Sequence, residues 1–266
     1  MKKLGLFLIL AFLALTVIYA VLFPYPDEFA QNDLFDEIVK RDKIKVGINT
    51  DSKPFGFYDE KGELSGYDVD LARYVAQYIL KNSQKVEFIP VTPSNRLIKA
   101  STGEVDIVIS TVTITPQRLE IVNFSVPYDV AGQAVLVKSN SSIKAISDLS
   151  GQVVGVIFGT TAEKNMKNLV PTANLRGFKT YPEAYLALKS GQINAITSDD
   201  TILSTFAVSD SSVKLLPKRY SYEPYGIAFK KSDSTRKLKE NLDFAIKDMK
   251  QKNIIQRLKK HWGVGV

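Results

Sequence analysis

The chain has 266 residues and a formal net charge of +7, and 45% of its residues are hydrophobic and 24% charged. This composition is that of a globular protein, and the length suits one large domain or two small ones. It contains no cysteine, which excludes disulfides, thiolate metal sites and a lipid-modified N-terminal cysteine. No aromatic-interleaved basic patch accompanies the positive charge, so we expect no nucleic-acid partner and favour steering of anionic solutes or attraction to an anionic membrane face.

The N-terminus predicts an export signal or a membrane anchor. Lys2 and Lys3 precede an uncharged apolar run over 4–23, and Pro24 ends it. The run exceeds the ~7 to 15 apolar residues of a cleavable signal and approaches the ~20 needed to cross a bilayer. No clean cleavage site follows, which slightly favours an uncleaved anchor. With the lysines on the cytoplasmic side, we predict an extracytoplasmic protein that has a signal or anchor at 1–23 and a linker at 24–42, which runs into a first helix.

Strand and helix patterns alternate from residue 43 onward. They predict a strand, a helix, a strand, a short helix and a strand over 43–48, 66–79, 86–90, 96–102 and 105–110. Asp68 is expected to cap the first of these helices, because a carboxylate satisfies free backbone N–H groups there. Such alternation favours a mostly parallel sheet with helices on its faces.

The same alternation starts afresh in the second half. Strands are predicted over 133–138, 151–157 and 193–197, with helices over 160–168 and 182–190. A last strand over 225–229 and two helices after it lack partners of their own, so we expect them to return to the first lobe. The prediction is a two-lobed α/β fold, each lobe a mostly parallel sheet flanked by helices. Lobe 1 takes 43–128 and 226–266, lobe 2 takes 133–221, and a two-strand hinge lies near 128–132 and 222–226.

Two polar loops follow strands at matching places in the two halves. Ser110 to Thr113 end one strand, and Thr160 and Thr161 begin a helix just after another. Open α/β sheets bind ligands beyond the carboxyl ends of their strands, and hydroxyls with free N–H groups at a helix start suit an anion. The alternative for the second loop is a plain helix cap, which is the commoner use of Gly-Thr-Thr.

Two charged residues complete a candidate site for a small zwitterion. Arg118 could pair bidentately with a carboxylate, although it could also be a surface arginine that pairs with Glu120 or stays free. Asp199 could pair with an ammonium group, and an N-cap for a helix over 200–206 is an equal alternative.

Catalytic and metal-binding patterns are missing from the sequence. The single histidine, His261, lies beside Trp262 in a basic helix and is interpreted as structural. No Gly-rich phosphate loop, HExxH or GxSxG occurs. We therefore expect no cofactor, no metal and no catalytic residue.

The stretch STVTITPQR at 110–118 resembles the solute-binding proteins of polar amino acid ABC transporters. The motifs GYDVDL at 66–71, GEVDIV at 103–108 and IVNFSVPY at 121–128 carry the same resemblance, which runs from about residue 43 to residue 262. It implies a periplasmic-binding-protein-like fold and no chemistry. Such a protein is a monomeric two-lobed clamp that closes on one amino acid and delivers it to a permease.

The resemblance also implies a role for each residue of the candidate site. The ligand α-carboxylate would bind Arg118, and the α-ammonium group would bind Asp199. The groups that assist the arginine would be Thr111, Thr113, Thr160 and Thr161.

Arg96 bears on the ligand side chain. The acidic amino acid branch is similar in carrying an arginine at this place, where it meets the second carboxylate of the ligand. Because an unpaired buried carboxylate is costly, glutamate or aspartate is the expected ligand, with glutamine or another polar amino acid as the alternative. Arg96 could instead cap its helix region or point to solvent.

The aromatic cover over the ligand departs from the family pattern. Asn49 and Ser52 precede the Pro54-Phe55 pair, where many relatives have an acidic residue and an aromatic one. Phe55 is the expected apolar cover, with Phe57 and Tyr58 as alternatives. Any of the three could equally belong to the core.

Two other functional classes fit the same fold. A dehydratase or a murein-acting enzyme would need an added acid–base group, for which Glu163 is the candidate. A ligand sensor would fit a retained anchor, but only two lysines precede the apolar run and no cytoplasmic effector is visible. A transporter permease is the more economical partner.

Overall fold

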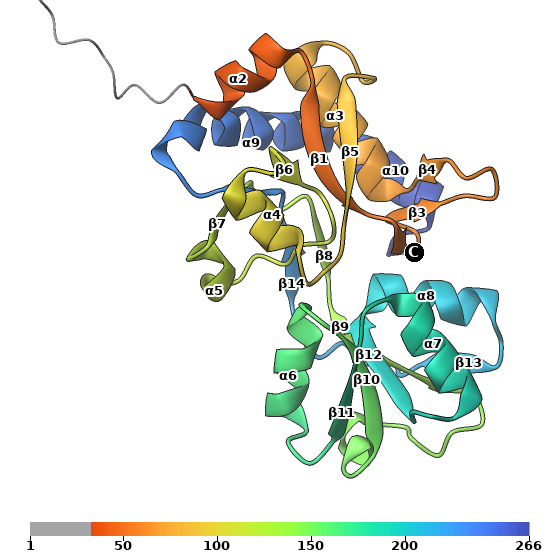
Figure 1. The fold of residues 1–266 in the computed structure, drawn as a ribbon. Coiled ribbons are helices and arrows are strands. Elements are labelled where there is room, and N and C mark those ends of the chain that lie inside the picture. Colours follow the sequence, from red (N-terminus) through yellow and green to blue (C-terminus); the bar gives the residue numbers. More distant parts are fainter. Residues whose placement is uncertain (1–32, 266) are drawn as a thin grey trace, which may run out of the picture. The chain divides into compact units, whose positions relative to one another are not determined.

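The structure is a computed structural model that describes residues 33–265 (Figure 1). The predicted signal or anchor at 1–23 lies outside the described residues. Over 33–265, no helix combines the length and the apolar character that a membrane crossing requires. The described part of the predicted linker is partly helical: α2 (Leu34–Arg41) starts from Asp33, packs against α9 (Arg236–Gln251) and buries Ile38 completely, so it belongs to lobe 1.

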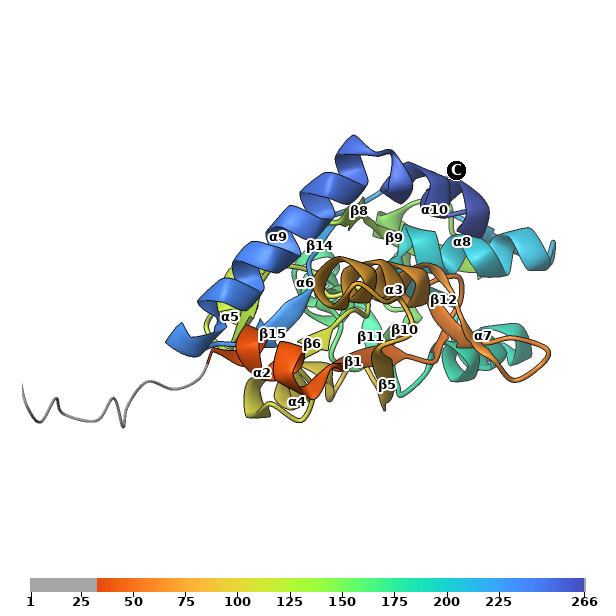
Figure 2. The same ribbon diagram turned by 90° about the horizontal axis from the view of Figure 1, so that it is seen from above.

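Lobe 1 is built on a five-stranded sheet with the order β5-β1-β6-β15-β7. Its strands are β1 (Ile44–Asn49), β5 (Val86–Val91), β6 (Ile107–Val108), β7 (Val122–Phe124) and β15 (Ala228–Lys230). Helix α3 (Tyr67–Leu80) lies on one face beside α9 and α10 (Ile254–Trp262), and α4 (Arg96–Thr102) covers the other (Figure 2). The C-terminal helices therefore pack on lobe 1.

Lobe 2 repeats this plan with the order β11-β10-β12-β9-β13. Its strands are β9 (Gln133–Lys138), β10 (Val153–Ile157), β11 (Asn174–Phe178), β12 (Ala195–Asp199) and β13 (Val213–Leu215). Its helices are α6 (Thr161–Leu169), α7 (Tyr181–Ser190) and α8 (Asp200–Ser209), with a 3₁₀ turn over Ile146–Leu149. Both lobes are α/β, as predicted.

The two sheets are mixed in the same way. Four of the five strands in each sheet run in one direction, and the remaining strand runs antiparallel to both of its neighbours. In lobe 1 the antiparallel strand is β15, and in lobe 2 it is β9. Each is the first sheet strand after the chain crosses from the other lobe, so the direction of entry accounts for the one antiparallel strand in a sheet that is otherwise parallel.

Two short strands join the lobes. β8 (Asp129–Ala131) pairs antiparallel with β14 (Glu223–Tyr225), and each leads into one of the entering strands. The buried apolar cluster continues through this junction, because it includes Tyr128 and Ala131 together with residues of both sheets. Two connecting strands thus run side by side between the lobes, and both lie inside the predicted hinge segments.

Helix α3 begins differently from the prediction. Its N-cap is Gly66 at φ 132°, and Asp68 lies buried in the first turn with no capping bond. A Cβ atom at residue 66 would stand 2.1 Å from the carbonyl oxygen of Phe55, so glycine is required by both conformation and space. The Asp68 carboxylate is consequently free to bind residues distant in sequence.

A small three-stranded sheet stands between β1 and α3 in the chain. It consists of β2 (Asp51–Ser52), β3 (Gly56–Tyr58) and β4 (Leu64–Ser65). Phe55 sits in its first turn and is 1% exposed, with edge-to-face contacts to Tyr67 at 5.7 Å and Tyr225 at 5.9 Å between ring centroids. This turn therefore delivers an aromatic ring to the junction between the lobes.

Candidate functional site

The polar loop over 110–113 is the centre of the candidate site. It follows β6, and all four of its residues are at most 5% exposed. Thr113 forms a β-bridge with Tyr225, and Val112 accepts a hydrogen bond from the Gly226 N–H group at 3.0 Å. The loop is therefore fixed against the second connecting strand.

Arg118 lies next to this loop because of a local helix start. Thr115 caps α5 (Pro116–Leu119) by accepting a hydrogen bond from the Arg118 N–H group at 3.2 Å, and Pro116 suits the first helical position. The guanidinium group donates to the Thr113 carbonyl at 2.8 Å and to the Gly159 carbonyl at 3.0 Å. Arg118 thus bonds to both polar loops and does not pair with Glu120.

The surroundings of Arg118 disfavour its positive charge. The residue is 8% exposed, and burial together with the like charge of Arg96 lowers its pKa to about 10, while Asp199 and Glu223 act in the opposite direction. A buried cation of this kind gains from an anionic partner. The site therefore offers a place for a carboxylate.

Arg96 points inward from the first residue of α4. It is 3% exposed, and one of its terminal nitrogens donates to the Ser110 carbonyl and, at 3.4 Å, to the Thr111 carbonyl. Burial lowers the pKa of Arg96, and its Nε has no partner among the described residues. The alternatives of a helix cap and a solvent-facing side chain do not apply.

Asp199 ends β12 in lobe 2 and occupies the N-cap position of α8. Its side chain makes no capping hydrogen bond there and instead accepts a hydrogen bond from the Tyr225 hydroxyl. Burial raises the pKa of Asp199 to about 7, partly offset by this bond. An ammonium group beside the carboxylate would favour its charged form.

The hydroxyls of the lobe 2 loop make local contacts. Thr160 donates to the Ile157 carbonyl at 2.8 Å, and Thr161 donates to the Glu223 carboxylate at 2.9 Å. Neither hydroxyl caps α6, but the first N–H groups of any helix are left without intrahelical partners. Those groups remain suited to an anion.

Several residues of the site were missed by the sequence analysis. Tyr67, Tyr128, Tyr181 and Tyr225 are at most 4% exposed, and three of them surround Phe55 or one another at ring distances of 5.7 to 6.2 Å. Their spacing along the chain resembles that of ordinary core residues. Glu223 is also buried and binds Thr161, Asn165 and Ser221; a charged residue within a short apolar strand was the available signal.

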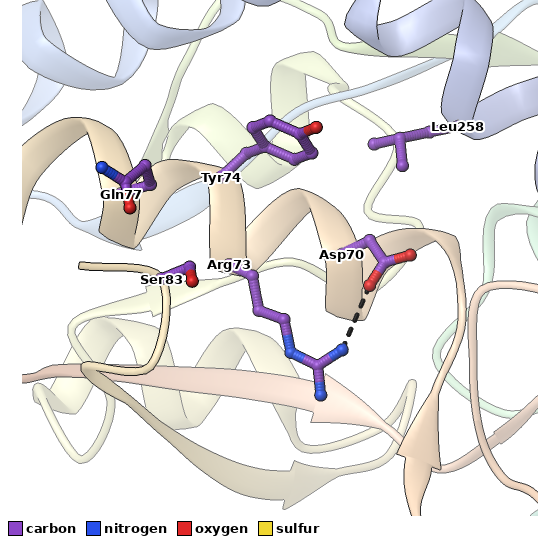
Figure 3. Close-up of a pocket in the computed structure, with 6 residues that line it drawn as sticks. All are labelled: Asp70, Arg73, Tyr74, Gln77, Ser83 and Leu258. Atoms are coloured by element: carbon purple, nitrogen blue, oxygen red, sulfur yellow. Dashed lines mark hydrogen bonds and ion pairs between the residues drawn. The ribbon is translucent and has the colours of Figure 1, made fainter. Parts of the chain in front are cut away.

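Other predicted groups stay apart from this site. Glu163 pairs with Lys167 one turn along α6 at 2.9 Å, and His261 packs edge-on against Trp262. A pocket of about 450 Å³ opens beside α3 and α10, where Arg73 and Asp70 pair at 3.1 Å (Figure 3). It contains none of the predicted site residues. Within 33–265, no cluster of three or more His, Cys, Asp or Glu residues could hold a metal ion.

Known proteins with similar sequences cover most of this chain. It is 36% identical over 235 residues to the ABC transporter glutamine-binding protein GlnH of Bacillus subtilis, covering 88% of this chain and 85% of the relative. It is 38% identical over 200 residues to a glutamine-binding protein of Geobacillus stearothermophilus, covering 74% of this chain and 76% of the relative.

Solved structures with the same architecture include binding proteins and a precursor of an enzyme. An ancestral arginine-binding protein, solved with arginine and with glutamine, is 36% identical with a TM-score of 0.77 over 84% of this chain and 98% of its own. An ancestral amino acid-binding protein described as a precursor of cyclohexadienyl dehydratase is 36% identical with a TM-score of 0.79 over 86% and 98%. The model of the bacterial extracellular solute-binding proteins, family 3, matches residues 44–265, and the chain belongs to this family.

Proposed function

We propose that this protein binds L-glutamine outside the cytoplasm and delivers it to the permease of an ABC transporter. The choice of the ligand side chain rests on Arg96, whose guanidinium group already donates hydrogen bonds to the carbonyls of Ser110 and Thr111. The printed names of two relatives, both glutamine-binding proteins, support the same ligand.

The backbone part of the ligand would be held as a zwitterion. Arg118 would bind the α-carboxylate, with Thr111 and Thr113 on one side. The Thr160–Thr161 helix start would face it from lobe 2, since Arg118 already bonds to Gly159 in that loop. Asp199, steadied by the Tyr225 hydroxyl, would bind the α-ammonium group. Because the two charges of the ligand bind different lobes, the ligand favours the closed arrangement.

The ligand side chain would be neutral and polar. An acidic side chain is the expectation from an arginine at residue 96, but two backbone carbonyls already accept hydrogen bonds from that guanidinium group. A second carboxylate would also add negative charge near Asp199 and Asp68, whose own charged forms are disfavoured by burial, with pKa values of about 7. A cationic side chain would meet the Arg96 charge. An amide avoids both penalties, and its oxygen can accept from the unpartnered Nε.

The transporter role rests on the family and on the relatives. A binding protein of this family carries its ligand to a membrane partner, and the apolar run over 4–23 would export the chain or hold it near that partner. Glu163, the acid–base group that an enzyme would need, is paired with Lys167. That pairing favours binding over catalysis.

Calorimetric titration of the purified full-length chain tests the choice of ligand. We expect L-glutamine to bind more tightly than L-glutamate, L-aspartate or L-arginine, by at least about tenfold or 1.4 kcal/mol. The control is Arg96→Gln, which removes the positive charge of residue 96. The difference in affinity between L-glutamine and L-arginine should be smaller in this variant than in the wild type. Tightest binding of glutamate would restore the acidic assignment, and absence of binding to all four would contradict the proposal.

A further inference from the structure

A buried carboxylate connects the candidate ligand loop to the strand that crosses between the lobes. Asp68 is 1% exposed. One of its oxygens accepts a hydrogen bond from the Thr111 N–H group at 3.0 Å, and the other accepts one from the Tyr128 hydroxyl at 3.1 Å. These partners lie 43 and 60 residues away in the chain, so the bridge is a product of the tertiary fold.

Thr111 needs such support because its backbone is in an unfavourable conformation. Its φ of 46° lies in the left-handed region, which a β-branched residue rarely adopts. Conformations of this kind cost on the order of 1–3 kcal/mol and persist only where the surroundings fix them. Here Asp68 accepts from the N–H group of Thr111, and Arg96 donates to its carbonyl. The residue is thus held from both sides.

Tyr128 extends the connection to the junction. It is the last residue before β8, and its own N–H group donates to the Tyr225 carbonyl at 2.9 Å. The ring centroids of these two tyrosines lie 6.1 Å apart. Tyr225 in turn donates its hydroxyl to Asp199 in lobe 2. Asp68 therefore stands between a loop of lobe 1 and the residues that reach lobe 2.

We propose that Asp68 is a positioning residue for ligand binding. It holds Thr111 in the left-handed conformation that orients the 110–113 loop, and it ties this loop to Tyr128 at the start of the first connecting strand. The carboxylate itself does not touch the ligand. The inference rests on the proposed function, because the loop it positions is the one assigned to the ligand carboxylate.

A glycine rescue separates this role from a general contribution to stability. Glycine adopts a φ of 46° without strain, so Thr111→Gly removes the need for support at that residue. We expect Asp68→Ala to weaken L-glutamine binding by at least about tenfold in the wild-type background, as for loss of hydrogen bonds to a charged group. In the Thr111→Gly background the same change should cost no more than about threefold, the remaining loss coming from the Tyr128 contact.

Two milder variants guard against a failure of Asp68→Ala to fold. Asp68→Asn keeps an acceptor for the Thr111 N–H group and should retain affinity within about threefold. Tyr128→Phe removes only the hydroxyl that bonds to Asp68, so it should weaken binding by no more than about threefold while leaving Thr111 in place. An equal loss from Asp68→Ala in both residue 111 backgrounds would overturn the proposal.

Amide hydrogen exchange provides a readout that does not depend on the ligand. In the ligand-free wild type the Thr111 N–H group should exchange slowly, and in Asp68→Ala at least about tenfold faster, while Asp68→Asn preserves the protection. If no variant changes the exchange of Thr111, the positioning role is wrong. If the wild type binds no glutamine but the exchange follows this pattern, the proposed ligand fails and the positioning role stands.

Discussion

The two polar loops of the candidate site are built in different ways. In lobe 1, residues 110–113 are almost completely buried and are held by charged side chains from α3 and α4 and by pairing with β14. In lobe 2, Phe158 is 46% exposed, and the Thr160 hydroxyl reaches only the carbonyl of Ile157. The first loop is fixed by its own lobe, and the second depends more on contacts made across the junction.

This difference assigns unequal tasks to the two lobes. A site that is already organised loses less conformational freedom when it binds, so lobe 1 should provide most of the affinity for the ligand carboxylate. Lobe 2 should contribute through Asp199 and through the approach of its loop. Substitutions can test this division of tasks, and the first is at the residue that contacts both loops.

Arg118→Ala should have the largest effect on binding. The guanidinium group bonds to Thr113 in one loop and Gly159 in the other, and it is the proposed partner of the ligand carboxylate. We expect at least about 100-fold weaker binding of L-glutamine by calorimetry, since removing one partner of a buried ion pair costs about 3–5 kcal/mol. Arg118→Lys keeps the positive charge but cannot bind a carboxylate bidentately, so its affinity for L-glutamine should lie between those of the wild type and Arg118→Ala. A loss below about threefold for Arg118→Ala would remove Arg118 from the site.

Asp199→Asn should weaken binding by about 30-fold or more, because the amide offers no charge to the ligand ammonium group. The same substitution should not lower the thermal stability of the ligand-free protein at alkaline pH. Burial raises the pKa of Asp199 above the usual value of 3.8 to about 7, so the free protein loses stability as the pH rises from about 4 to about 7, and above pH 7 the full cost of the buried charge is present. The variant should therefore melt no lower than the wild type at pH 8. A lower melting temperature there would indicate that the charge stabilises the fold.

Binding of L-glutamine should depend on pH through the same carboxylate. With a pKa of about 7 in the free protein, Asp199 must lose a proton to pair with an ammonium group at lower pH. Affinity should fall roughly tenfold between pH 8 and pH 6, and Asp199→Asn should abolish most of that change. Asp68 titrates in the same range, with its pKa also about 7, but it is retained in both proteins. A pH dependence that persists in the variant would assign the effect to Asp68.

Gly159→Ala should have the smallest of these effects, because it removes no group that is proposed to bind the ligand. Gly159 has a φ of 79°, and a Cβ atom there would lie 2.4 Å from the carbonyl oxygen of Pro93 in lobe 1. We expect binding to weaken about threefold to tenfold as the lobes are held apart. Gly62→Ala is the matched control, since Gly62 has a φ of 77° with nothing within 4 Å of an added Cβ atom. Equal binding losses in both variants would attribute the effect to backbone strain.

The sequence allowed the fold to be predicted because its signals are local. Periodicity over short windows marked helices such as α3 and α4 and the alternation of strands and helices in both halves. The antiparallel direction of β9 and β15 was not predicted, because it follows from where the chain re-enters each sheet. Helix α2 was assigned to the linker because its few apolar residues find their partner in α9, some 200 residues away.

The sequence indicated candidate residues for the site, but it did not indicate their contacts. The motif around Arg118 identified the loop and the arginine, and the structure brings both together. The partners of Arg96 and Asp68 could not be foreseen, because Ser110, Thr111 and Tyr128 reach them only through the tertiary fold. Asp68 was expected to be a helix cap because acidic residues favour that position, but Gly66 takes it here and frees the carboxylate.

In the proposed complex, Arg118 and Asp199 bind the two opposite charges of one ligand. Calorimetric titration with L-glutamine, with glutaramic acid and with 4-aminobutanamide tests it most directly, since the second compound lacks the α-amino group and the third lacks the α-carboxylate. We predict that glutamine binds at least about 100-fold more tightly than either analogue, because each leaves one buried charge without its partner. Binding of either analogue within about tenfold of glutamine would contradict the clamp.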